Sequence, residues 1–101
     1  MANAIIDFPF AYSHLDDSGI VHAVGGDVLH SVIINHPDAT AAATVTMYDG
    51  VDNSGDVIAV IAMDKAIYVV PVTLIYDIAV TTGIYAEFSH TDGADITVTH
   101  G

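Results

Sequence analysis

The sequence predicts an all-β protein, a single antiparallel β-sandwich of about eight strands in a jelly-roll-like arrangement. Short runs rich in Val, Ile, Thr and Tyr alternate apolar and polar side chains with a period of two, which is typical of strands with one buried face. Clusters of Gly, Asp, Asn, Ser and Pro separate these runs at nearly regular intervals, as turns do. No segment has a helical period long enough to predict a helix.

The clearest element is a hairpin over residues 44–63. In its first strand Val45 and Met47 alternate with Thr and Tyr residues, which places the two apolar side chains on one face. Residues 49–56 are turn formers, because Gly supplies positive φ and Asp and Asn hydrogen-bond to their own backbone. Residues 57–63, Val-Ile-Ala-Val-Ile-Ala-Met, then form the second strand.

The chain before this hairpin alternates less regularly. Residues 4–8 are a short strand candidate that Pro9 ends or confines to a sheet edge, because proline cannot donate to a strand ladder. A second short strand, containing Phe10, Tyr12 and Leu15, is expected next. A Gly-Gly pair and an Asn-His-Pro-Asp sequence provide the following turns. Two further strands are predicted in this half, over residues 20–24 and 28–34.

After the hairpin, Pro71 separates two apolar runs, since it lacks the backbone N–H that a strand interior needs. The sequences Thr82-Gly83 and Thr91-Asp92-Gly93 supply the last turns. The strands predicted in this half cover residues 66–70, 72–80, 84–89 and 96–99.

The length of 101 residues fits one domain with its own core, and the absence of Cys excludes disulfides and Cys metal ligands. Residues 20–101 are predicted to form the β-sandwich domain, and residues 1–19 an N-terminal strand or arm. Two interpretations of residues 1–19 stay open. The segment is either the ordinary first strand of the sandwich or an arm that packs on a neighbouring subunit.

The charge composition excludes several classes of partner. The chain has one Lys, no Arg and thirteen acidic residues, for a formal net charge of −12. Nucleic acids and anionic lipids are bound through Lys and Arg, so we expect neither a nucleic acid nor a membrane as partner. Hydrophobic residues make up 52% of the chain and charged residues 14%, the reverse of a disordered composition. With no basic signal-peptide region at the start, we expect a soluble, compact chain made in the cytoplasm.

Six histidines among many acids raise the hypothesis of a metal site, since zinc sites use His and carboxylate ligands. Their spacing matches no compact metal motif such as His-Glu-x-x-His, so surface and turn histidines are the favoured interpretation and no metal ligand is assigned. His30 differs, because it lies inside a strong strand, and we expect its ring nitrogens to bond to a neighbouring strand or turn. The histidines are His14, His22, His30, His36, His90 and His100.

The loop from Asp49 to Asp56 is rich in oxygen ligands, which calcium prefers. It lacks the Gly and Glu that an EF-hand loop needs at its sixth and twelfth positions. The favoured interpretation is a turn in which Asp49 and Asn53 cap backbone amides. The sequence alone leaves calcium binding by this loop open.

Catalysis and cofactor binding find little support in the sequence. The chain has one Glu, Glu87, and no nucleophile elbow, phosphate-binding glycine loop or cofactor fingerprint. We therefore predict no enzyme, no catalytic residue and no cofactor. The five tyrosines raise the rival hypothesis of a sugar-stacking platform, although strand tyrosines ordinarily pack on cross-strand neighbours.

The order of these signals resembles small β-sandwich structural proteins of tailed-bacteriophage virions. The resemblance runs through most of the chain after residue 20 and is loose before it, and this chain carries fewer basic residues than such proteins usually do. The matching motifs are Gly26–Asn35 (with Leu29-His30), Met47–Gly50, Asn53–Gly55, Pro71–Leu74, Thr82–Tyr85 and Ala94–Val98.

This resemblance implies a non-enzymatic structural virion protein, of the capsid decoration (cement) or head-accessory type, located on the capsid surface. The implied partners are the phage capsid protein and further copies of the chain, a trimer by analogy with decoration proteins. A protein bound across several capsid subunits stabilises the head by its binding free energy. The alternative function is a carbohydrate- or receptor-binding β-sandwich module of a phage tail or fibre.

Overall fold

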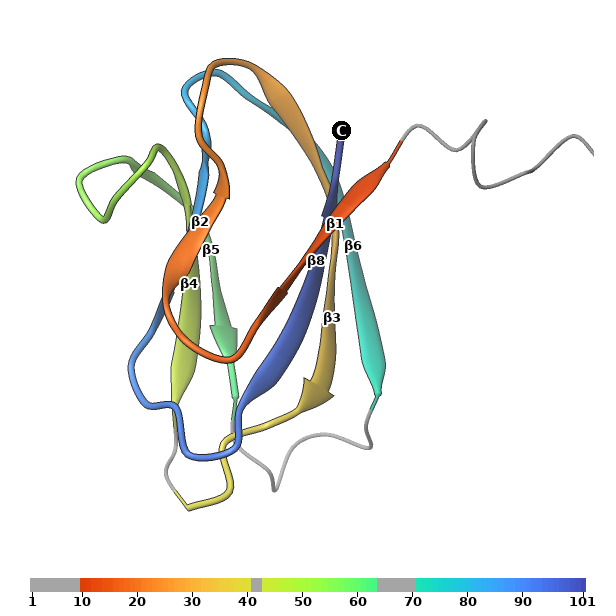
Figure 1. Ribbon diagram of the computed structural model, residues 1–101, viewed down its shortest axis with the longest axis vertical. Coiled ribbons are helices and arrows are strands. Elements are labelled where there is room, and N and C mark those ends of the chain that lie inside the picture. The colour runs from red at the N-terminus through yellow and green to blue at the C-terminus, as the bar shows by residue number, and fades with distance from the viewer. Residues whose placement is uncertain (1–9, 41–42, 64–70) are drawn as a thin grey trace, which may run out of the picture.

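The chain folds into two β-sheets that pack face to face. The computed structural model describes residues 10–40, 43–63 and 71–101. Within these ranges there is no helix, and hence none that could cross a membrane. The strands in Figure 1 are β1 (Ala11–Leu15), β2 (Gly19–His22), β3 (Asp27–His36), β4 (Thr44–Asp49), β5 (Asp56–Ala62), β6 (Val72–Val80), β7 (Ile84–Phe88) and β8 (Asp95–His100).

The strand order is that of a jelly roll. One sheet has the order β1-β8-β3-β6 and the other β2-β7-β4-β5, with every pair antiparallel. The pairs β1–β8, β2–β7, β3–β6 and β4–β5 are successive segments of one long antiparallel ribbon, which alternate between the two sheets. Folding a ribbon over in this way produces the eight-stranded double-sheet jelly roll, so the predicted fold class is confirmed.

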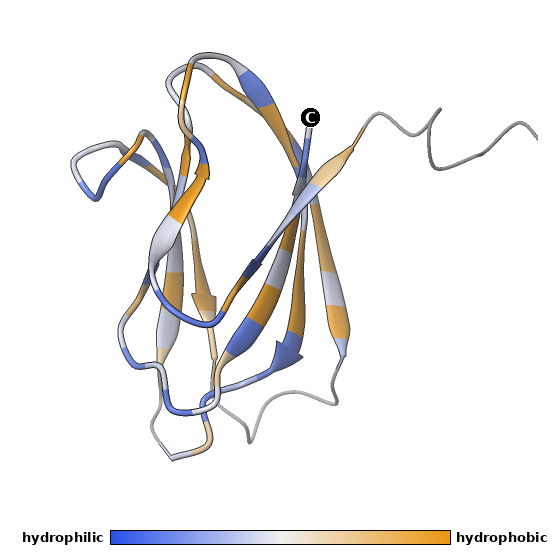
Figure 2. Cartoon of the chain, in the orientation of Figure 1, coloured by the Kyte–Doolittle hydropathy of each residue, from blue (hydrophilic) through white to orange (hydrophobic). Residues whose placement is uncertain are grey.

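The core lies between the sheets and follows the alternation of the strands. Val45 and Met47 in β4, and Ile96 and Val98 in β8, are completely buried, whereas their immediate neighbours in each strand are less so. Figure 2 shows the alternation in β4 and β8 as changes of colour along the strand, whereas β5 is hydrophobic along most of its length. The buried apolar side chains are Val21, Leu29, Val32, Ile34, Ala43, Val45, Met47, Ile61, Met63, Val80, Ile84, Ala86, Phe88, Ala94, Ile96 and Val98.

Most predicted strands occur within a few residues of the expected bounds. The hairpin of residues 44–63 is confirmed as β4 and β5. The strand predicted over 20–24 ends earlier, at His22, because Gly25 adopts a φ of 74° and its N–H donates to the Thr82 carbonyl, which turns the chain away from the sheet. The strands predicted over 4–8 and 66–70 lie outside the described residues.

The segment 10–19 contributes β1, an edge strand that pairs with β8 in the register Ala11↔His100 to Leu15↔Ile96. Leu15 packs against the core, and residues 16–18 then turn the chain into β2 of the other sheet. For these residues the structure shows the first strand of the sandwich. Residues 1–9, to which the arm interpretation also applies, lie outside the described part of the chain.

Candidate functional site

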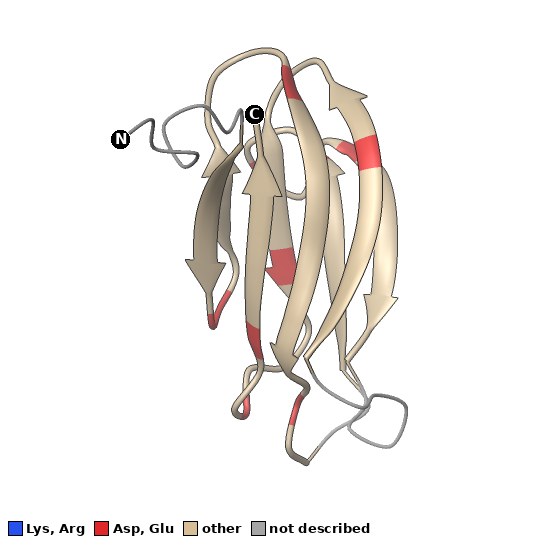
Figure 3. Cartoon of the chain, turned by 90° about the vertical axis from the view of Figure 1, so that its right-hand side faces the viewer, with Lys and Arg blue, Asp and Glu red and all other residues tan. Residues whose placement is uncertain are grey.

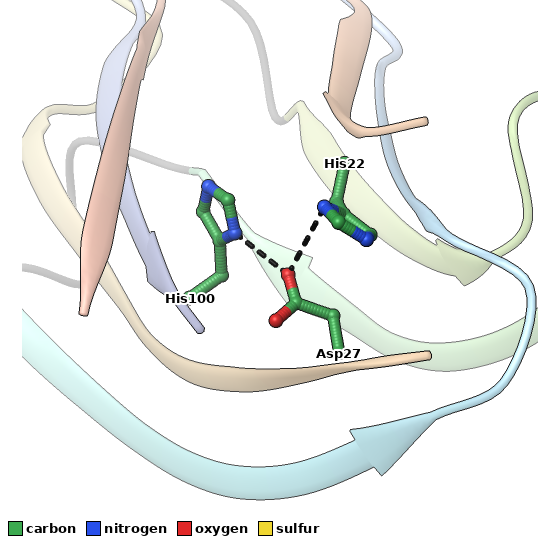
Figure 4. Close-up of side chains that lie close together, drawn as sticks. All are labelled: His22, Asp27 and His100. Carbon is green, nitrogen blue, oxygen red and sulfur yellow. Dashed lines mark hydrogen bonds and ion pairs between the residues drawn. The ribbon is translucent and has the colours of Figure 1, made fainter. Parts of the chain in front are cut away.

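Three polar side chains close one end of the core, where the apolar residues stop (Figure 4). In β8 the buried Val98 is followed two positions later by His100, which therefore also points inward. His22 in β2 lies opposite the buried Ile84 of β7 and faces the same interior. Asp27, the first residue of β3, reaches toward both histidines. The cluster thus joins β2 of one sheet to β3 and β8 of the other.

A single carboxylate oxygen organises this cluster. Oδ2 of Asp27 lies 2.7 Å from Nδ1 of His100 and 3.4 Å from Nδ1 of His22. The Asp27 and His100 side chains are only 9% and 12% exposed, and that of His22 is 29% exposed. Burial raises the pKa of Asp27, but hydrogen bonds from His100 and the Val28 backbone, with the charge of the histidines, outweigh it and hold the pKa below its usual value. Asp27 is therefore an ionised, nearly buried carboxylate.

The cluster has the donor set of a metal centre. Each of the three residues offers one ligand atom, and these atoms lie within 4.8 Å of one another. Among the groups the structure describes, this is the one combination of three or more His, Asp or Glu side chains so placed. Nε2 of His22 is buried and has no hydrogen-bond partner among the described residues. Within the same residues, the one polar contact that orients the His22 ring is that of its Nδ1 with Asp27.

Sequence reasoning did not find this cluster, because His100 of β8 lies 73 residues beyond Asp27 and meets it only in the folded sandwich. Compact metal motifs place their ligands within one short segment, and no such segment contains both His100 and the other two residues. A usable signal was present in the alternation. His100 continues the inward series of β8, where a polar residue is expected to have a partner. The identity of that partner depends on which strands the topology brings together.

His30 has the structural role that its position in a strong strand predicted. Its Nδ1 contacts the carboxylate of Asp77 on the neighbouring strand β6, and its ring stacks on Phe10 with centroids 3.9 Å apart. The β3–β6 register shifts at this point, and Asp77 adopts a left-handed φ of 52°, a conformation that Asp tolerates better than most residues. The irregularity directs the carboxylate at the histidine.

Two of the remaining histidines each contact a single acceptor group. Nε2 of His14 lies 2.7 Å from a carboxylate oxygen of Asp95 on the exposed face of the first sheet. His36 contacts the carbonyl of Pro37 next to it in the chain. Neither belongs to a group of three metal-ligating side chains within the described ranges.

Asp49 joins the β4–β5 loop to the β6–β7 turn. Its carboxylate accepts hydrogen bonds from the backbone N–H groups of Thr81, Thr82 and Gly83, and from the Thr81 hydroxyl. These bonds, led by the Thr81 N–H, hold the pKa of Asp49 below its usual value. Asp49 therefore caps backbone amides, as predicted, although these amides belong to the distant β6–β7 turn and not to the loop that follows Asp49. Since both oxygens are engaged, little capacity remains for calcium.

Within the loop, Asp52 rather than Asn53 caps the backbone. Its carboxylate accepts from the Ser54 N–H and hydroxyl, an Asx turn, and these bonds lower the pKa of Asp52. The Asn53 side-chain amide instead donates to the Glu87 carboxylate of β7, 3.1 Å away. The prediction that Asn53 caps a backbone amide is wrong, because the ionised carboxylate of Asp52 is the stronger acceptor and takes the loop N–H, while the Asn53 side chain acts as a donor to Glu87.

The Asp49 contacts predict an acid-sensitive component of stability. Because the folded-state pKa of Asp49 lies below its unfolded value, its ionised form contributes stability above the unfolded pKa, and this is lost as pH falls through the folded pKa. We expect the stability lost in Asp49→Asn to be constant above about pH 5 and to shrink progressively below about pH 4. Urea unfolding of both proteins across this range measures it. The exposed Asp56→Asn is the control, and a difference for Asp49→Asn that does not change with pH would contradict the assignment.

The outer face of the second sheet carries an apolar row that crosses all four strands. Cross-strand pairing aligns Ile20 of β2, Tyr85 of β7, Tyr48 of β4 and Val57 of β5. Ile20 and Val57 are 51% and 58% exposed. The tyrosine rings are tilted at 43° with centroids 6.2 Å apart, so the predicted cross-strand packing of these two tyrosines is confirmed. We call these four residues the apolar row.

The opposite outer face, on the first sheet, is hollowed. A concavity of about 370 Å³ lies over β1, β8, β3 and β6. Its floor includes the hydrogen-bonded Ser31 and Thr99 hydroxyls, and its walls carry aromatic and aliphatic side chains. It is lined by Phe10, Ala11, Tyr12, His30, Ser31, Ile33, Thr73, Ile75 and Thr99.

The surface is acidic throughout the described part of the chain. The single basic side chain, Lys65, falls outside the described residues. In the view of Figure 3 most acidic residues lie at strand ends and turns, although Asp77 and Glu87 lie within β6 and β7. No Lys or Arg among the described residues lies beside the apolar row or the concavity. The sheet faces of soluble proteins, by contrast, often carry charged residues of both signs.

Comparison with known proteins gives no relative: no protein-family model, curated protein sequence or solved structure matches this chain.

Proposed function

We propose that this chain is a non-enzymatic structural protein of a virion, a decoration (cement) protein that binds the capsid surface and stabilises the head. The apolar row on the second sheet is the observation that carries the proposal. In this interpretation the row is the surface through which copies of the chain associate when they assemble on the capsid.

The fold supports this proposal in general terms. The double-sheet jelly roll is an architecture of viral capsid domains, although it also serves lectins and other proteins. The motifs shared with phage structural proteins fall on elements of this fold. Gly26–Asn35 covers all of β3 except its last residue, His36, and Ala94–Val98 covers most of β8. These strands pair with each other at the centre of the first sheet.

The exposed apolar side chains of the second sheet support an association surface, which the decoration function requires. Monomeric proteins rarely leave a continuous apolar strip across a whole sheet, because such a strip favours association. β5 is also an edge strand, and the described chain offers no Lys or Arg to protect it. A second copy or a capsid protein that covered this face would remove Ile20 and Val57 from water.

Sedimentation of matched variants tests the surface. We expect the wild-type chain to self-associate, and the double variant Ile20→Thr/Val57→Thr to associate at least about tenfold more weakly, because each burial of an aliphatic side chain contributes on the order of 1 kcal/mol or more. Threonine keeps the β-branch at Val57 and introduces no charge. Val24→Thr is the control, since Val24 is 82% exposed but lies in the β2–β3 loop outside the row.

Immunogold labelling of phage particles tests the proposed position of the chain on the capsid. Gold-labelled antibodies against the chain should decorate the heads of tailed-phage particles whose genome encodes it. Absence of the label from the particles would refute a virion role. A wild-type chain that stays monomeric at every concentration and on the capsid, or a Val24→Thr variant impaired as much as the row variant, would refute the assignment of the surface.

The concavity of the first sheet favours a second candidate function, a carbohydrate- or receptor-binding module of a tail or fibre. The exposed Tyr12 offers an aromatic ring in the same concavity as the hydroxyls of Ser31 and Thr99, a combination suited to sugars. Label on tail tips rather than heads, with sugar binding that is lost in Tyr12→Ala, would favour this function over capsid decoration.

A further inference from the structure

We propose that His22, Asp27 and His100 form a binding site for a divalent transition-metal ion of the zinc type, which links the two sheets at the end of the core. The inference depends on the geometry of the three side chains and is independent of the proposed virion function. The three residues come from β2, β3 and β8, and no other described residues take part.

The separations between the ligand atoms suit such an ion. Zinc bonds of about 2.0–2.2 Å to nitrogen and oxygen at tetrahedral angles place neighbouring ligand atoms about 3.3–3.6 Å apart. The 3.4 Å between Nδ1 of His22 and Oδ2 of Asp27 already lies in this range. The 2.7 Å contact of His100 with the same oxygen must lengthen by about 0.6 Å or more, which a small rotation of the Asp27 carboxyl group allows.

A metal ion can take the place of the protons that hold this cluster together. Two Nδ1 atoms converge on one carboxylate oxygen, so without an ion each ring must carry a proton on Nδ1 to contact it favourably. One divalent cation in place of those protons interacts with both nitrogens and the oxygen together. His22 has no other hydrogen bond among the described residues that would hold its ring back from this rearrangement.

The donor set selects the class of metal. Two imidazole nitrogens and one carboxylate are ligands for zinc and other first-row transition ions, with at least one coordination position left for water. Calcium and magnesium prefer six or more oxygen ligands, which this cluster does not offer. The formal charge of −12 raises the local concentration of any cation but does not select among them.

Zinc titration of the full, untagged chain tests the site, because a polyhistidine tag would itself bind zinc. We expect calorimetry to show one Zn²⁺ per chain, and the midpoint of thermal unfolding to rise with zinc but not with calcium. Co²⁺ should give a visible absorption band from the same site. His22→Ala and His100→Ala should each lower zinc affinity about a hundredfold, at least as much as the loss of an outer-shell partner does.

Matched histidine variants separate this site from zinc bound elsewhere. His14 and His30 each pair with one carboxylate, with Asp95 and Asp77, and His14→Ala and His30→Ala should leave zinc affinity unchanged. No binding to the wild-type chain, or equal losses in all four variants, would overturn the proposal. If His100→Ala fails to fold, His22→Ala still tests the proposal, because the His22 side chain is more exposed. Unchanged zinc affinity in His22→Ala would also overturn the proposal.

Discussion

Replacing Gly83 with alanine is expected to destabilise the protein by about 3 kcal/mol, the upper range for an extra methyl group forced into a packed site. A Cβ at this position would lie 2.7 Å from the His22 carbonyl oxygen and 2.9 Å from that of Gly50. Both contacts are with backbone atoms, which cannot move without moving β2 and the β4–β5 loop. The Gly83 carbonyl also accepts from the Gly50 N–H, so relief of the clash would break this bond. Thermal and urea unfolding measure the loss.

Gly26→Ala is the matched control for Gly83→Ala. Its added Cβ would meet only the Val80 carbonyl oxygen at 3.5 Å, an ordinary contact distance. We expect a change within about 1 kcal/mol of zero, with a gain if the reduced freedom of the unfolded chain dominates. Equal effects of the two substitutions would mean that loss of glycine flexibility, rather than the close approach of the three segments, determines the result.

Replacing Asp38 with alanine is expected to destabilise the protein by about 2–3 kcal/mol, because a completely buried acceptor is removed. The Asp38 carboxyl group accepts hydrogen bonds from the backbone N–H groups of Thr40 and Asp92, at 2.9 and 3.1 Å. It thereby ties the chain after β3 to the β7–β8 loop. Without it, both N–H groups lose their partner and the side-chain volume is left empty or filled by water. Urea unfolding at neutral pH measures the difference.

Two variants define the cause of the Asp38 effect. Asp16→Ala removes the same charge from an exposed position in the β1–β2 turn, and we expect it to be nearly neutral. Asp38→Asn keeps one carbonyl acceptor and should lose less stability than Asp38→Ala. If Asp16→Ala and Asp38→Ala behave alike, the net charge of the chain, rather than the buried hydrogen bonds, would account for the change.

The all-β fold and most strand positions could be predicted because they depend on local alternation. Val45 and Met47 are buried since every second residue of a strand faces the same side, whatever the strand packs against. The end of β2 at His22 could not be predicted. Ala23 and Val24 continue the apolar run, but the contact of Gly25 with Thr82 removes them from the sheet, and that contact is distant in sequence.

The candidate site could be predicted from the sequence even less completely than the strands. The sequence by itself determined the residue types, the lack of Cys and basic residues, and the inward position of His100 at the end of its strand. Tertiary structure alone decided that His22 and Asp27 meet His100, and that Asp49 caps a turn more than thirty residues away rather than its own loop. Strand order determines these contacts. It depends on how the whole antiparallel ribbon folds over to bury both apolar faces, which no single segment of the sequence encodes.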